Sequence, residues 1–381
     1  MASPPPASPR ILDSHIHLWP ESAANEDGHT WMTPGAPLAR PYLLSDYLAA
    51  SHGAPVVGAV FIETDRRLTP VENNGADDET TILTRCAGPL DELAWLRSLV
   101  EEDDAGREML WGLVPWAPFD ASPIAFRRYL DAAEKAAGVT AWARVCGWRY
   151  LVQGITDEAV FRRLVGSSGW MENLRECGRR GWCFDVGVDA RSGGLWQLEA
   201  VADMIEKVRG LEDAEGVGER GQGRVTFILN HLCKPDMLQH HPTSASQLQA
   251  LLDAFESWTV CMRRFARLPR VYMKLSGGFS EMDLASDATV DQVVPRLKLH
   301  LDVVFRCFTA QRVMFGSDWP VCNVRGPGGD ERAWRAWRDA VERVVGGREA
   351  GGYDLSHEQR DRVWFGTAVE AYGLTPPSVR K

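Results

Sequence analysis

Continuous apolar runs alternate with amphipathic segments along most of the chain. Runs without internal polar positions are typical of strands buried on both faces of a parallel sheet. The segments between them carry apolar residues at helical spacing. The pattern predicts strands at residues 10–14, 56–62, 109–116, 139–149, 181–188, 224–230, 270–275 and 312–316. It predicts helices at residues 44–51, 90–102, 124–137, 158–179, from 195, 246–267, 291–308, 332–345 and 357–371.

Eight strands that alternate with helices predict an α/β fold of the (β/α)8 TIM barrel class. No segment has the character of a domain linker, so we expect a single domain over residues 10–375 after a flexible tail at 1–9. Residues 20–41 lack periodicity, and so long a loop is unusual unless it covers a site. We therefore expect this segment to fold over the pocket as a lid. Surface loops are expected at 72–79 and 210–223.

The composition of the chain limits the classes of molecule that it could bind. The chain has 381 residues, of which 45% are hydrophobic and 25% charged, as in globular proteins with a large core. A formal net charge of -10 argues against nucleic acid, and the lack of a long apolar run argues against a membrane. Eight cysteines without a tight framework, and no secretory signal, predict a cytoplasmic protein. A small-molecule substrate is expected, and a homo-oligomer is left open.

The first strand leads into His15 and His17, which the period of a strand places on one face. Asp13 alternates with them and is expected on the same face. Two imidazole nitrogens that converge on one point suit a divalent metal or, without metal, a polar substrate. His-x-His also occurs by chance in soluble chains, so its position at the first strand of the barrel pattern is what favours a site.

Polar residues end almost every predicted strand, and in a barrel these ends gather on one face. Individually they have structural alternatives: Glu63 and Lys274 could pair as ions, Arg149 could brace a loop, and His231 could be a core histidine. A structural role for all of them together is disfavoured. The set comprises His15 and His17, then Glu63, Arg149, Asp185, His231, Lys274 and Asp318. Trp19, Trp31, Trp148 and Trp319 lie beside these residues and could form apolar walls.

Several segments carry a family resemblance. Residues 13–19 (DSHIHLW) and 315–321 (FGSDWPV) resemble the amidohydrolase superfamily in its lactonase-like branch. Residues 147–153, 230–235 and 274–277 match that branch in order and spacing. The whole set is similar to the fungal L-rhamnono-γ-lactonase-like proteins, over roughly residues 10–375.

The resemblance implies that His15, His17 and Asp318 bind a metal or activate water, with His231 nearby. The chain departs from the family's binuclear pattern because Arg149, and not a lysine, ends the fourth strand. We therefore expect at most one divalent ion, zinc in particular, bound by His15 and His17 with Asp318 or His231 as a third ligand. Some members of the branch work without metal, so a metal-independent mode stays open.

The leading hypothesis is hydrolysis of a sugar-derived lactone to the free acid. Asp318 would take a proton from water with His231 beside it, while a metal or the imidazoles polarise the carbonyl. The residues expected to contact the substrate are Glu63, Arg149, Asp185, Arg191, Lys274 and Trp19. The alternatives are a metal-dependent decarboxylase or hydratase of the same superfamily, and a barrel that binds a sugar acid without turnover.

Overall fold

The computed structural model describes residues 10–71, 78–218, 223–237, 244–347 and 352–377. All strands in this part of the chain are parallel to their neighbours. They are β1 (Ile11–Ile16), β2 (Val56–Ile62), β3 (Leu110–Val114), β4 (Gly147–Arg149), β5 (Cys183–Val186), β6 (Thr226–Leu229), β7 (Val271–Leu275) and β8 (Val313–Phe315).

The strands run in the order β1-β2-β3 and β4-β5-β6-β7-β8. Isolated parallel bridges join the two groups at both seams. Leu113 pairs with Val145 and Trp116 with Arg149 between the third and fourth strands, while Ile16 pairs with Trp319 between the first and eighth. The strands therefore form the α/β barrel that the alternation of elements predicts.

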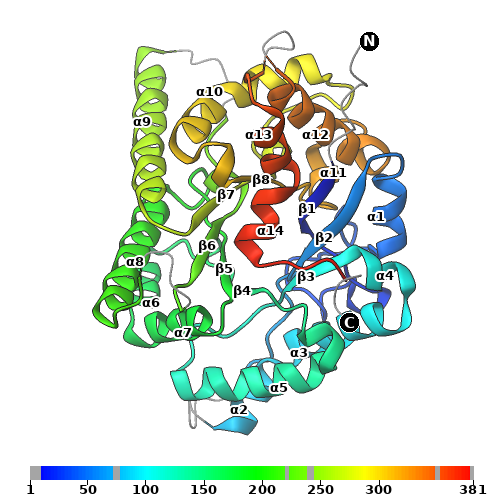
Figure 1. Cartoon of the computed structure of the whole chain (residues 1–381), viewed down its shortest axis with the longest axis vertical. Helices are drawn as coiled ribbons and strands as arrows, with labels where there is room; N and C mark the ends of the chain where they lie inside the picture. Colours follow the sequence, from blue (N-terminus) through cyan, green and yellow to red (C-terminus); the bar gives the residue numbers. More distant parts are fainter. Residues whose placement is uncertain (1–9, 72–77, 219–222, 238–243, 348–351, 378–381) are drawn as a thin grey trace.

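Helices surround the strands (Figure 1). They are α1 (Leu44–Ala50), α2 (Glu79–Arg85), α3 (Ala87–Glu102), α4 (Asp104–Met109), α5 (Pro123–Trp142), α6 (Glu158–Val165), α7 (Ser168–Arg179), α8 (Leu195–Ala214), α9 (Ala245–Arg267), α10 (Val290–Phe308), α11 (Cys322–Arg325), α12 (Gly329–Val345), α13 (His357–Asp361) and α14 (Thr367–Tyr372). Side-chain caps set many of their starts: Ser122, for example, accepts a hydrogen bond from the backbone of Ala125 at the start of α5.

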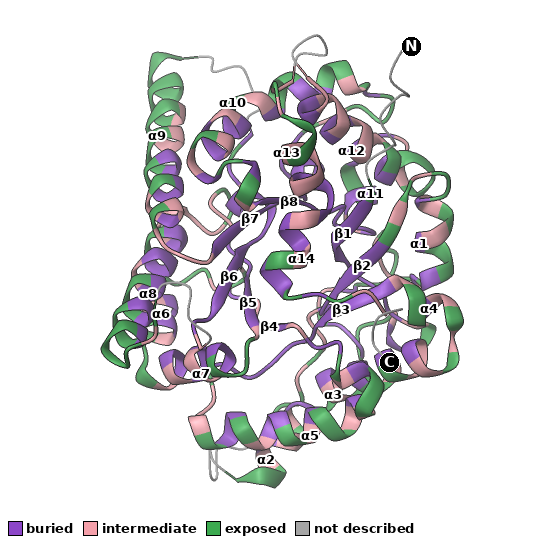
Figure 2. Ribbon diagram, viewed as in Figure 1, coloured by how far each residue is buried: buried purple, intermediate pink, exposed green. Residues whose placement is uncertain are grey.

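Two apolar layers hold the barrel together. One lies between strands and helices, and the other fills the barrel interior with Leu12, Ile62, Ile228 and Met314. Phe365 closes the interior at the end where the strands begin, with its ring against Trp111. Figure 2 shows the strands almost entirely buried and the outer faces of the helices exposed. The opposite end of the barrel, where the strands finish, is thus left for a site.

Several boundaries differ from the sequence expectation. The predicted strand at 139–149 is only Gly147–Arg149, because α5 continues to Trp142 and exposes Val139. The predicted helix at 158–179 is two helices, since Ser167 caps a new start. Helix α8 extends to Ala214, into the predicted loop at 210–223; residues 219–222 of that loop, and 72–77 of the other, lie outside the described residues.

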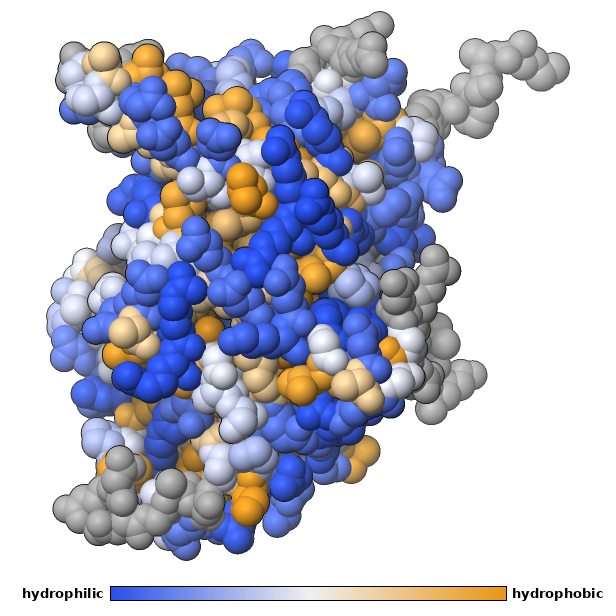
Figure 3. Space-filling model, turned by 90° about the vertical axis from the view of Figure 1, so that its left-hand side faces the viewer, coloured by the Kyte–Doolittle hydropathy of each residue, from blue (hydrophilic) through white to orange (hydrophobic). Residues whose placement is uncertain are grey.

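The molecular surface is mostly polar on the side formed by α6, α8 and α9. Figure 3 shows this side covered mainly by hydrophilic side chains, with the hydrophobic ones in small separate areas. Among the described residues, no helix combines the length and apolarity needed to cross a bilayer.

Candidate active site

A shift in strand register turns the end of β1 into the barrel. The β1–β2 pairing is irregular after Asp13, so Asp13 and His15 do not share a face. The carboxylate of Asp13 accepts hydrogen bonds from the Tyr47 hydroxyl (3.0 Å) and Trp334 Nε1 (3.1 Å), on helices outside the barrel. The expectation that Asp13 lies with the histidines is therefore wrong. It accepts a third bond from the backbone N–H of Ser317 (2.8 Å), which anchors the segment after β8.

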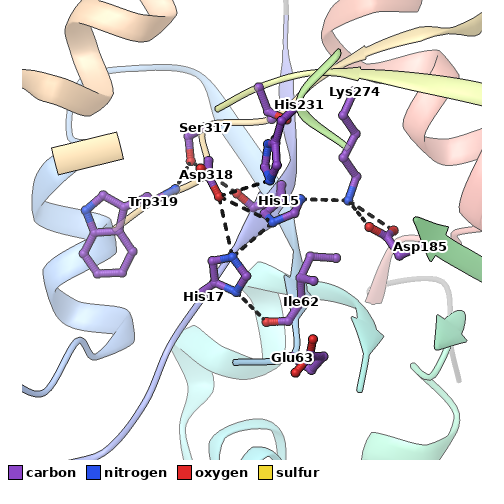
Figure 4. A network of polar contacts seen from close by, with 12 residues as sticks. His15, His17, Ile62, Glu63, Asp185, His231, Lys274, Ser317, Asp318 and Trp319 are labelled. Atoms are coloured by element: carbon purple, nitrogen blue, oxygen red, sulfur yellow. Dashed lines mark hydrogen bonds and ion pairs between the residues drawn. The ribbon is translucent and has the colours of Figure 1, made fainter. Parts of the chain in front are cut away.

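Three imidazoles surround one carboxylate oxygen (Figure 4). Asp318 Oδ1 lies 3.5 Å from His15 Nε2, 3.6 Å from His17 Nε2 and 3.7 Å from His231 Nε2. The Nε2 atoms of His15 and His17 are 3.0 Å apart. All four side chains are buried. The prediction that Asp318 comes within reach of the first-strand histidines is confirmed.

The second nitrogen of each imidazole has its own partner. His17 Nδ1 lies 2.9 Å from the carbonyl oxygen of Ile62, and His231 Nδ1 lies 2.9 Å from Ser276 Oγ. Gly277 must be glycine here, because its φ is +65° and a Cβ would come within 2.4 Å of His231 Nδ1. These contacts fix both rings with Nε2 turned toward Asp318.

The pKa values favour neutral imidazoles at His15 and His231 and an ionised carboxylate at Asp318. Burial lowers the pKa of His231 to about 3, and burial with the charge of Lys274 lowers the pKa of His15 well below its ordinary value. Burial would raise the pKa of Asp318, but His231 and His17 outweigh it and the pKa lies below its ordinary value. Neutral imidazoles and a carboxylate are the forms that act as ligands and bases.

The same side chains fit one divalent ion. Ligand atoms of His15, His231 and Asp318 all lie within 4.8 Å of one another, and His17 Nε2 is next to this group. Zinc bonds of about 2.0–2.1 Å in a tetrahedron separate ligand atoms by roughly 3.3 Å, close to the spacings here. A nitrogen and oxygen set of this kind suits zinc, and the partnered second nitrogens orient it.

Lys274 and Asp185 lie behind His15 rather than in the pocket. Lys274 Nζ contacts His15 Nδ1 at 2.9 Å and donates to both oxygens of Asp185 at 2.9 and 3.1 Å. The Tyr372 hydroxyl, from the last helix, donates to the same carboxylate at 2.6 Å. The charged pair is completely buried, so the structure places it where it can orient His15.

Glu63 and Arg149 form a second buried ion pair. Arg149 donates through Nε to the Glu63 carboxylate and through Nη2 to the Glu63 backbone oxygen (2.6 Å). Arg149 lines the same cavity as Asp318, whereas Glu63 is completely buried and is not among the residues that line it. Arg191 lies elsewhere: it pairs with Glu281 (3.3 Å) and lines a separate apolar groove beside α9 and α10.

A cavity of about 420 Å³ opens over Asp318. The sequence analysis missed several polar residues of this cavity. They lie in loops, one to five positions beyond the ends of the strands, or directly after residues of the motifs that carry the family resemblance. The lining residues are His17, Trp19, Trp31, Leu38, Thr64, Asp65, Arg149, Leu151, Gln153, Gly154, Gly187, Asn230, His231, Lys234, Ser280, Asp318 and Val321. Asn230 and Lys234 flank His231 inside a segment that the family resemblance already singled out.

The loop after β1 covers this cavity, as predicted. Trp31 and Leu38 line it, and Trp31 Nε1 donates to the backbone oxygen of Thr64 (3.0 Å). His29 Nε2 lies 2.7 Å from Thr64 Oγ1, which in turn donates to Glu92 at 2.5 Å. Thr64, just past β2, thus anchors the loop to the barrel.

The buried Glu92, which accepts the hydrogen bond from Thr64, makes the free energy of unfolding depend on pH. Burial, with the nearby charge of Glu63, raises the pKa of Glu92 from 4.5 to about 7. Because the folded pKa is the higher one, the stabilisation is present below about pH 4.5 and is lost as pH rises through 7. The free energy of unfolding of Glu92→Gln is therefore expected to exceed that of the wild type by about 3 kcal/mol at pH 8.5 and to differ little from it near pH 4.5. Urea unfolding at both pH values checks this; an equal difference at both would contradict it.

Comparison with known proteins agrees with this geometry. The amidohydrolase family model matches residues 12–374, so the chain belongs to the amidohydrolase family. The L-rhamnono-gamma-lactonase of Scheffersomyces stipitis is 29% identical, over 96% of this chain and 99% of the relative. The L-fucono-1,5-lactonase of Burkholderia multivorans is 26% identical, over 96% and 97%. A solved amidohydrolase from Burkholderia multivorans with bound zinc has the same fold, with a TM-score of 0.67 and 22% identity over 96% of this chain and 100% of that one.

Proposed function

We propose that this chain hydrolyses the ring ester of a sugar-derived lactone and releases the free sugar acid. The observation that carries the proposal is one carboxylate, Asp318, with an oxygen 3.5 to 3.7 Å from the Nε2 atoms of His15, His17 and His231 at the base of a cavity of about 420 Å³. Two relatives that match nearly the whole chain are named sugar lactonases, which supports the same substrate class. Residues 10–375 would act as one unit.

Asp318 accepts a proton from water in this proposal, and the water oxygen bonds to the lactone carbonyl carbon. The ring C–O bond then breaks, and the proton passes to the leaving ring oxygen. Arg149 lines the same cavity, and its guanidinium would stabilise the negative charge on the carbonyl oxygen. Trp19 and Trp31 supply apolar walls against the sugar ring.

One divalent ion, zinc in particular, would be held by His15, His231 and Asp318, with His17 adjacent. Such an ion supplies Lewis acidity to a carbonyl oxygen and acidifies water. The eight cysteines are all free, which supports a cytoplasmic location.

A screen of aldonolactones with a pH indicator tests the proposal, because each turnover releases one acid. Acid release that is stoichiometric with lactone consumption is the expected result. Release of carbon dioxide from a planar acid, with no lactone consumed, would instead favour a decarboxylase. Tight binding of a sugar acid with no turnover of any lactone would favour a binding protein.

Removal of metal is expected to lower the activity, since the ligand set suits one ion. Protein dialysed against a chelator should lose most of its hydrolysis, and equimolar zinc should restore it. Metal content and turnover are measured on the same preparations. Full activity in protein shown to be metal-free would establish the metal-independent mode, with Arg149 and the histidines polarising the carbonyl.

A further inference from the structure

The cavity over Asp318 contains a second carboxylate, that of Asp65. Asp65 lies three residues beyond the end of β2, is only partly buried, and lines the cavity together with Asp318. Its carboxylate has no hydrogen bond or ion pair to any other residue that the structure describes. The proposed hydrolysis uses Asp318 as the base, so the second carboxylate is free for another task.

The backbone at Asp65 is held by the buried ion pair of Glu63 and Arg149. The N–H of Asp65 donates to Glu63 Oε2 at 2.5 Å, while Arg149 Nε donates to the other oxygen of the same carboxylate. Asp65 has a φ of +57°, a left-handed conformation that costs a non-glycine residue about 1–2 kcal/mol. Such residues persist where the surroundings determine them, and they cluster at active sites. The ion pair thus fixes the backbone position from which Asp65 meets the cavity.

Both carboxylates border the space that one substrate molecule would fill. His17 lies between the two: its Nε2 is 3.6 Å from Asp318 Oδ1, and its Nδ1 is 2.9 Å from the Ile62 carbonyl oxygen, three residues before Asp65. The cavity volume of about 420 Å³ is within the range of about 300–1,000 Å³ found for pockets that hold one small ligand. A lactone in this cavity can therefore contact both carboxylates.

The surroundings shift the pKa values of the two carboxylates in opposite directions. Burial raises the pKa of Asp65 to about 6, the charge of Glu63 adds to the increase, and the charge of Arg149 opposes it. The pKa of Asp318 lies below the ordinary aspartate value. Two carboxyl groups whose pKa values are separated in this way are typical of an acid and a base in one active site.

We propose that Asp65 is the general acid of the reaction and donates a proton to the ring oxygen as the ring C–O bond breaks. Asp318 takes a proton from the attacking water, whose oxygen bonds to the carbonyl carbon. The electron pair of the breaking bond stays on the ring oxygen, which receives the proton of Asp65. After product release Asp318 gives its proton to solvent and Asp65 takes one up, so both return to their starting forms. This inference rests on the proposed lactonase function and adds a catalytic residue to it.

The test compares a sugar lactone with the thiolactone in which sulfur replaces the ring oxygen. An alkoxide needs a proton in order to leave, whereas a thiol has a pKa of only about 8.5 and leaves as the thiolate. Asp65→Asn keeps the shape of the side chain but has no acidic proton. Asp120→Asn is the matched control, since Asp120 pairs with Arg85 and is not among the residues that line the cavity. Values of kcat and KM on both substrates are measured together with Tm.

The expected result depends on the leaving atom. Asp65→Asn should lower kcat on the lactone by about 10² to 10⁴-fold, the usual contribution of a positioned acid. Its kcat on the thiolactone should stay close to that of the wild type, and Asp120→Asn should match the wild type on both substrates. Equal losses on both substrates in Asp65→Asn would overturn the proposal and indicate that Asp65 only holds the substrate.

The pH profile and a conservative variant give further readouts. Because the acid must carry its proton, kcat/KM of the wild type on the lactone should fall as the pH rises through about 6, and kcat/KM on the thiolactone should not. Asp65→Glu keeps an acid and should retain more of the lactone activity than Asp65→Asn. These two measurements decide the question even where Asp65→Asn has too low a Tm to be assayed. The same pH profile for both substrates would overturn the proposal.

A failure of the lactonase function itself gives a different result. A wild type that hydrolyses neither the lactone nor the thiolactone would overturn the function and, with it, the role of Asp65. A wild type that hydrolyses both, with an Asp65→Asn variant that equals it on both, would overturn the role of Asp65 alone. In that case Asp318 itself returns the proton to the ring oxygen.

Discussion

Replacing Asp318 by asparagine is expected to lower lactone hydrolysis by about 10² to 10⁴-fold, the usual contribution of a positioned general base. Asparagine keeps the shape and the reach toward the three imidazoles but cannot take a proton from water. Turnover, lactone binding and metal content are measured on one preparation, so that loss of the ion is separated from loss of the base. A folded, metal-replete Asp318→Asn variant with unchanged turnover would remove Asp318 from the mechanism.

A control and a pH profile sharpen this result. Asp330→Asn makes the same change at an exposed ion pair with Arg40 and should leave turnover unchanged. Because the pKa of Asp318 lies below the ordinary aspartate value, wild-type activity should fall only as the pH drops through that low value. An Asp318→Asn variant with residual activity should lack this acid limb.

Lys274→Met is expected to lower the free energy of unfolding by about 3–5 kcal/mol, as removal of one partner from a buried ion pair does. Methionine fills a similar volume, but the Asp185 carboxylate then stays completely buried, and among the described residues the Tyr372 hydroxyl is its remaining hydrogen-bond partner. Burial already lowers the pKa of Lys274, and Asp185 counteracts this, so each charge depends on the other. Urea unfolding at neutral pH measures the change.

The double variant Lys274→Met with Asp185→Leu is the control for that experiment. It removes both charges, so no isolated carboxylate is left in the core, and a large part of the lost stability should return. Both variants should lose activity, because the contact of Lys274 with His15 Nδ1 is absent in each. A double variant less stable than Lys274→Met alone would show that the pair does not account for the loss.

The sequence predicted the barrel and the central histidines because both depend on local patterns. Continuous apolar runs marked the strands, and the end of each run marked the rim of the site. His15, His17, His231 and Asp318 meet there because the barrel rule holds whatever their separation along the chain.

What the sequence could not show depends on backbone geometry and distant pairing. The register shift that turns Asp13 outward has no signature in the amino-acid sequence, since alternation alone would place Asp13 on the same face as His15. Nor do the positive φ angles of His231 to Lys234, because none of these residues is glycine. Lys274 and Asp185 satisfied the strand-end rule, but their mutual pairing buried both of them away from the cavity.

The contact between Tyr372 and Asp185 has a consequence for assembly of the site. His15 lies on the first strand, yet its orientation depends through Lys274 and Asp185 on a hydroxyl in α14. His15 therefore gains its full set of partners only when α14 has packed against the barrel, so the two ends of the described chain must come together before the site is complete.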